Sequence, residues 1–143
     1  MSINILEIES YSEKFANAIL THGEEVLKAK VWDESKDLKT SIEKKLSLIV
    51  EMNYDELISI KILDNYKDED SIIKAKDKNY IIRGKIIQFV ELKNDIWIDL
   101  YLQKGAEFIS ILKSQIKGKE VLLEQGLEIV VTNLMFFPSK NQY

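Results

Sequence analysis

The feature that most constrains this chain is a regular alternation of aliphatic side chains with polar or aromatic ones in its C-terminal half. The alternation is clearest in residues 95–102, where the aliphatic positions are Ile96, Ile98, Leu100 and Leu102. Successive side chains of a strand point to opposite faces, so this spacing predicts a strand with one aliphatic face. Residues 80–90 alternate similarly, and Leu92-Lys93-Asn94-Asp95 between the two runs predicts a hairpin turn.

Short apolar runs elsewhere predict further strands, at residues 3–8, 15–20, 26–32, 46–52, 57–63, 106–112 and 127–137. The lysine-rich segment 33–45 is polar and predicts a short helix, with Ser35 as its N-cap. The single proline and five glycines leave little room for long irregular stretches. The sequence therefore predicts a mainly β, antiparallel fold with one or two short helices.

The two halves of the chain resemble each other. A shift of 82 positions aligns residues 5–27 with 87–109 without a gap, and it places Phe15 on Trp97 and Gly23 on Gly105. The order of hairpin, glycine turn, strand, polar loop and apolar strand recurs, which favours a degenerate internal repeat. This order is compatible with small OB-like or SH3-like units.

We therefore expect an acidic β-rich unit at 1–63, a charged connector at 64–79 and a second β-rich unit at 80–143. The alternative is that both units pack as a single domain. Residues 1–71 carry 16 acidic and 9 basic side chains, a balance of -7, whereas residues 72–143 carry 8 and 11, a balance of +3; together they give the net charge of -4. A polarised surface of this kind reflects either packing of complementary halves or attraction of a charged partner.

Composition argues against most kinds of catalytic and metal site. The chain has no cysteine, and His22 is its only histidine, so thiolate and multi-histidine metal sites are excluded. The acidic run 64–70 fails as a calcium loop, because Tyr66 holds a ligand position and Glu69 stands where the turn needs glycine. No glycine-rich phosphate loop is visible. We expect no enzyme activity, no cofactor and no metal.

Neither end of the chain suggests a membrane protein. Residues 1–7 have no basic segment or long apolar run, so no signal peptide is predicted. The longest apolar stretch, residues 134–138, is far shorter than the roughly 20 residues needed to span a bilayer. The expectation is a cytoplasmic protein.

The best candidate site is the polar face of the C-terminal hairpin. With the aliphatic face inward, Trp97, Asp99 and Tyr101 point outward. Simple alternation places Phe89 beside them, on the same face as Arg83 and Lys85. Exposed aromatic side chains next to charges are typical of recognition surfaces. The alternative is that the other half, or a second copy, buries this face.

The first functional hypothesis is a non-catalytic protein-binding module, for example an acidic inhibitor, antitoxin or immunity-type protein with a basic partner. One alternative is a self-assembling structural component of a phage or secretion assembly, which would form a homo-oligomer. The other is an oligonucleotide-binding barrel that stacks bases on Phe89, Trp97 and Tyr101. In that case Arg83, Lys85 and the lysines at 74, 76 and 78 would contact phosphates.

Overall fold

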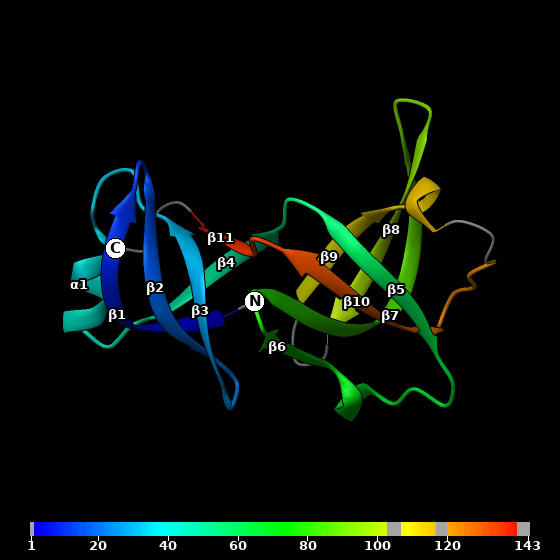
Figure 1. Ribbon diagram of the computed structural model, residues 1–143, viewed down its shortest axis with the longest axis horizontal. Coiled ribbons are helices and arrows are strands. Elements are labelled where there is room, and N and C mark those ends of the chain that lie inside the picture. Colours follow the sequence, from blue (N-terminus) through cyan, green and yellow to red (C-terminus); the bar gives the residue numbers. More distant parts are fainter. Residues whose placement is uncertain (1, 103–106, 117–119, 140–143) are drawn as a thin grey trace.

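The computed structural model describes residues 2–102, 107–116 and 120–139, which form two β units lying side by side (Figure 1). One unit is a closed five-stranded barrel and the other is a six-stranded sheet. The mainly β fold predicted from the alternation is confirmed. The strands are β1 (Ser2–Ser12), β2 (Phe15–His22), β3 (Glu25–Trp32), β4 (Ser47–Asn53), β5 (Leu57–Leu63), β6 (Ile72–Lys76), β7 (Asn79–Leu92), β8 (Asp95–Leu102), β9 (Glu107–Leu112), β10 (Gly126–Thr132) and β11 (Met135–Pro138).

The barrel has the strand order β1-β2-β3-β11-β4, and β4 pairs back with β1 to close it. All its pairs are antiparallel except β3 with β11, which is parallel. The inward residues of β2 are Ala16, Ala18 and Leu20, each at most 1% exposed. These small side chains, with Leu27 and Phe136 from other strands, fill the narrow interior.

A short helix, α1 (Leu38–Glu43), joins β3 to β4 as the sequence predicted. Its N-terminus is held by Asp33 rather than by Ser35. The buried Asp33 carboxylate accepts hydrogen bonds from the backbone N–H groups of Asp37 (2.8 Å) and Leu38 (3.3 Å) and from the Tyr11 hydroxyl (2.6 Å). The Ser35 hydroxyl instead donates to the Asp37 side chain. The cap prediction was wrong because the chain turns back at residues 33–37, which brings a more distant carboxylate over the helix end.

The second unit has the strand order β5-β10-β7-β8-β9, and β6 also pairs with β7. β7 is long enough to change partners along one edge, pairing with β6 up to Arg83 and with β8 from Lys85 onward. Gly84 lies at the change-over. A Cβ atom there would lie 2.6 Å from the Tyr101 carbonyl oxygen, so only glycine allows β8 to approach this closely.

The two units exchange strands. After β4 the chain crosses into the second unit, where β5 pairs with β10; after β10 it crosses back, and β11 pairs with β4. The two crossovers, residues 54–56 and 133–134, lie side by side. The Thr132 carbonyl oxygen accepts a hydrogen bond from the Asp55 N–H (3.1 Å), and the Thr132 N–H donates one to the Glu56 carbonyl oxygen (2.9 Å). The Asn133 amide donates to the Asp55 carboxylate at 2.7 Å.

This exchange groups the residues differently from the predicted units. β5 lies before the expected connector and β6 within it, yet both belong to the second sheet. The apolar run 127–137, predicted as one strand, is divided between β10 and β11 because Asn133 adopts a positive φ of 49°. Buried side chains from both units also form one contiguous hydrophobic cluster.

The predicted repeat corresponds to a shared order of elements. β1-β2-β3 and β7-β8-β9 are both antiparallel meanders, followed by a helical turn (α1; η2, Lys113–Gln115) and then by β4 or β10. The first turns, at Glu13-Lys14 and Lys93-Asn94, are 80 positions apart rather than the 82 of the sequence alignment. Both shifts are even, so either one matches the inward residues of β2 and β3 with inward residues of β8 and β9, but not those of β1 with β7 or of β4 with β10.

Because of the exchange, we expect the units to unfold together. Phe136, in β11, is fully buried in the barrel, and Phe136→Ala should lower the free energy of unfolding by about 3–5 kcal/mol. Tryptophan fluorescence can follow each unit separately, using Trp32 in a Trp97→Phe variant and Trp97 in a Trp32→Phe variant. Phe136→Ala should lower the free energy of unfolding reported by Trp32 and that reported by Trp97 by the same amount. A decrease reported by Trp32 alone would contradict the coupling of the two units.

Candidate functional site

The predicted basic residues Arg83 and Lys85 are engaged by acidic neighbours. The Arg83 Nε lies 2.7 Å from the Glu128 carboxylate on the adjacent strand β10. The Lys85 ammonium lies 3.4 Å from Asp68 and 3.4 Å from Glu124, and Asp68 raises the pKa of Lys85. Asp68 belongs to the expected connector, which folds over this face of the sheet. Neither cation projects free into solvent, and neither forms part of an open phosphate-binding surface.

Asp99 lies on the same face of β8 as Trp97 and Tyr101, as predicted, but it is buried. It is 6% exposed and accepts hydrogen bonds from the Gln88 amide (2.5 Å) and the Ser110 hydroxyl (2.6 Å). Trp97 and Tyr101, on the same face of β8, are half-buried. Asp99 therefore ties β7, β8 and β9 together.

Phe89 does not share a face with Arg83 and Lys85. The pairing of β7 with β8 shifts by one residue between Ile86 and Gln88, and after this bulge Gln88 lies opposite Asp99 while Phe89 lies opposite Ile98. Cross-strand partners point to the same side, so Phe89 lies on the opposite face from Trp97. The prediction was wrong because alternation counted from the sequence does not register an inserted residue. The six predicted residues are therefore not gathered into one site.

The bulge marks the base of a projecting hairpin, residues 87–97, which we call the arm. In Figure 1 it is the yellow-green ribbon that extends away from both units. β10 pairs with β7 only as far as Lys85, and β9 pairs with β8 only from Trp97 onward. Four apolar side chains of the arm are exposed: Ile87 (37%), Phe89 (38%), Leu92 (58%) and Ile96 (40%).

The arm is well defined despite its exposure. The predicted turn is confirmed, since Lys93 and Asn94 join the strands with positive φ values of 49° and 69°. Two positive φ values match the natural twist of a two-residue hairpin. At its base, the Lys113 ammonium lies 5.6 Å from the Phe89 ring centroid. The arm thus presents apolar groups on a preformed backbone.

A second candidate surface was not predicted from the sequence. Phe15, Trp32 and Phe137 come from β2, β3 and β11 and form the barrel aromatic cluster. The ring centroids lie 5.2 Å (Phe15–Trp32), 5.7 Å (Phe15–Phe137) and 6.2 Å (Trp32–Phe137) apart. All three side chains are half-buried. The strand exchange brings Phe137 to the other two rings, and no local sequence signal marks this.

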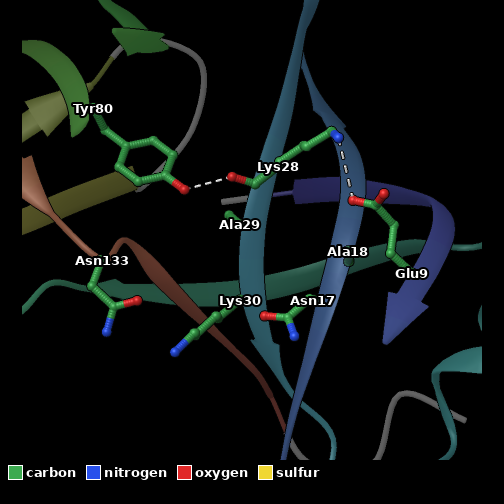
Figure 2. A pocket seen from close by; sticks show the side chains of 8 residues that line it. All are labelled: Glu9, Asn17, Ala18, Lys28, Ala29, Lys30, Tyr80 and Asn133. Carbon is green, nitrogen blue, oxygen red and sulfur yellow. Dashed lines mark hydrogen bonds and ion pairs between the residues drawn. The ribbon is translucent and has the colours of Figure 1, made fainter. Parts of the chain in front are cut away.

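Next to the cluster along β2 and β3, at the pair Asn17–Lys30, lies a pocket of about 170 Å³ (Figure 2). It is lined by Glu9, Asn17, Ala18, Lys28, Ala29, Lys30, Tyr80 and Asn133. Tyr80 reaches it from the second unit and donates a hydrogen bond to the Lys28 carbonyl oxygen. Figure 2 shows the Lys28 side chain extending toward Glu9, while Lys30 extends the opposite way. The pocket volume is smaller than the 300 Å³ or more that is typical of pockets for drug-sized ligands.

No metal-binding arrangement is evident in the described parts of the chain. Within residues 2–102, 107–116 and 120–139 no three acidic or histidine side chains are placed to hold a metal ion. None of the helices in those segments is long and apolar enough to cross a membrane. The sequence matches no protein-family model, and neither a curated protein nor a solved structure shows significant similarity to the chain.

We expect Asp99 to act in stability rather than in binding. Asp99→Ala leaves the Gln88 amide and the Ser110 hydroxyl without their acceptor, which should lower the free energy of unfolding by about 1–3 kcal/mol. Asp95→Ala, at the exposed end of the same strand, is the matched control and should change it by less than about 0.5 kcal/mol. Urea unfolding of both variants tests this. Equal losses of unfolding free energy in the two variants would contradict the stabilising role of Asp99.

The raised pKa of Tyr66 predicts that the folded protein loses stability at alkaline pH. It packs on Gly126 next to Asp68 and Asp70, and burial, with a smaller effect of the two carboxylates, raises its pKa from 10.0 to about 12. Between these values the unfolded state has released the proton and the folded state has not, so stability falls as the pH rises. The urea midpoint should drop less in Tyr66→Phe than in the parent between about pH 9 and about pH 11.5. An equal drop would contradict the assignment.

Proposed function

We propose that this protein is a non-catalytic binding module that docks onto another protein through the arm. The observation that carries the proposal is the exposure of Ile87, Phe89, Leu92 and Ile96 on a hairpin that extends beyond its sheet. A two-stranded ribbon is marginally stable by itself, and leaving apolar side chains in water forgoes their burial. A partner that covers them would recover roughly 1 kcal/mol for each half-exposed side chain.

The arm is apolar on both faces, so it suits insertion into a groove. Phe89 and Ile96 lie on the side of Ile98, whereas Val90 and Leu92 lie on the side of Trp97. Its charged residues, Glu91, Lys93 and Asp95, stand at or near the tip. The arrangement of an apolar centre with a charged rim is that of a protein interface.

The charge distribution supports a basic partner. The first 71 residues carry a balance of -7, and such a field increases the association rate with a positively charged protein. We therefore include in the proposal that the protein is an acidic inhibitor, antitoxin or immunity-type protein that binds a basic partner. The proposal also places the protein in the cytoplasm.

We further propose that the barrel is of the OB type. Its closed order β1-β2-β3-β11-β4, with the parallel pair β3–β11 and a helix between β3 and β4, supports this. The second unit repeats the same cyclic order in open form, with β5 in the place of β11. The assignment is an analogy of fold and does not identify a ligand.

The docking proposal is tested by placing a photo-crosslinking amino acid at position 92 in the producing cells. Position 58 is the matched control, because Ile58 is an exposed aliphatic residue on β5 with a similar exposure, 52% against 58% for Leu92. A crosslinked protein should be recovered from position 92 and not from position 58. With that protein purified, Leu92→Asn should weaken binding by about tenfold and Ile58→Asn should leave it unchanged.

Self-assembly is a defined outcome of the same experiment. If the crosslinked protein is a second copy of this chain, light scattering of the parent should show a mass that rises with concentration, and Leu92→Asn should abolish the rise. Equal crosslinking at positions 92 and 58 would show that the arm is not a docking site.

A further inference from the structure

The outer face of the barrel carries a row of aromatic, amide and cationic side chains that protein docking by the arm does not use. On β2 and β3 the outward cross-strand pairs are Phe15–Trp32, Asn17–Lys30 and Ile19–Lys28. The row begins at the barrel aromatic cluster and ends at the pocket beneath Tyr80. From Phe15 to Ile19 it extends about 13 Å along the strand.

The aromatic end of the row is also supplied with a cation. The Lys14 ammonium lies 5.7 Å from the Trp32 ring centroid and 3.0 Å from the Glu34 carboxylate. Both members of this ion pair are more than half exposed, at 57% and 59%. An exposed pair of this kind contributes at most about 1 kcal/mol, so a competing anion exchanges with the carboxylate at small cost.

The pocket end has two further lysines. The Lys28 ammonium lies 3.5 Å from the Glu9 carboxylate, and its side chain is 74% exposed. Lys30 makes no ion pair with any residue in the described segments and projects from the pocket wall. Lysines therefore lie along the whole row, with Lys14 at the aromatic end, Lys30 opposite Asn17 in the middle and Lys28 opposite Ile19. The Asn17 amide itself donates hydrogen bonds to the hydroxyls of Ser10 (3.0 Å) and Ser12 (2.9 Å).

We propose that this outer face of β2, β3 and β11 is a binding site for single-stranded nucleic acid. The bases stack on Trp32 and its neighbouring rings, Lys14, Lys28 and Lys30 contact phosphates, and the pocket takes one base or sugar of the same strand. Stacking platforms combined with a cationic track are the physical basis of single-strand binding. The pocket is too small for a whole drug-sized ligand, but it suits one unit of an extended polymer.

The charges on the face determine how the binding depends on salt. Glu9 and Glu34 oppose the strand until their lysines turn to the phosphates. The balance of -7 in residues 1–71, which include β2 and β3, also lowers affinity for a polyanion. Three phosphate contacts predict that the logarithm of the association constant falls with the logarithm of salt concentration with a slope of about -2. Binding is therefore strongest at low salt.

The test uses a Trp97→Phe variant, in which Trp32 is the only tryptophan. At low salt, titration with oligothymidylate of about 16 nucleotides, at the upper end of the usual site size, should quench the Trp32 fluorescence. Fluorescence anisotropy of a labelled oligonucleotide should show that Trp32→Ala weakens binding at least about tenfold. Lys30→Glu, a charge change at a half-buried side chain outside the aromatic cluster, should weaken it several-fold and lower the salt slope.

Two comparisons make the outcome decisive. Leu92→Asn in the arm should leave oligonucleotide affinity unchanged, so failure of the docking proposal and failure of this one are distinguishable. Duplex DNA of the same length should bind more weakly than the single strand. Absence of binding at low salt, or equal affinity of the parent, Trp32→Ala and Lys30→Glu proteins, would overturn the proposal, as would quenching of Trp32 by proline-rich peptides but not by oligonucleotides.

Discussion

The structure depends on the two crossovers at residues 54–56 and 133–134. At each of them the chain leaves one unit and delivers its next strand to the other unit. Their backbones hydrogen-bond to each other through Thr132, and the Asn133 amide binds the Asp55 carboxylate. Neither unit contains its full set of strands unless the other unit is folded, which explains why the buried side chains form one cluster.

The exchange also makes two similar halves unequal. β11 lies between β3 and β4 and closes the barrel, whereas β5 lies on the far side of β10 and the second sheet stays open in the described residues. An open sheet has room for an additional strand and for a hairpin that continues past its neighbours, and this chain has both in β6 and the arm. The same topology brings Phe137 to Phe15 and Trp32 and brings Tyr80 to the barrel wall.

The two proposed surfaces therefore belong to different units and have different chemistry. The arm offers aliphatic groups and Phe89 on a preformed ribbon, which suits the apolar groove of a protein. The barrel face offers rings, an amide and lysines in exposed ion pairs, which suits a flexible polyanion with flat bases. A protein with both properties would connect a single strand to a second protein.

The sequence alone determined most of the strands, though not β6 or the division between β10 and β11. It also determined the hairpin turn at Lys93-Asn94 and the repeated order of elements, because each depends on local alternation and turn chemistry. It failed at Phe89, where the bulge after Ile86 reverses the alternation, and at Asp33, which caps a helix from outside the local motif. Only the tertiary structure decided which unit each final strand joins. That choice rests on hydrogen bonds and packing between residues about 80 positions apart, such as Asp55 with Thr132, and no pattern along the chain encodes such distant partners. The barrel aromatic cluster is a consequence of the same choice, so it could not have been found from the sequence.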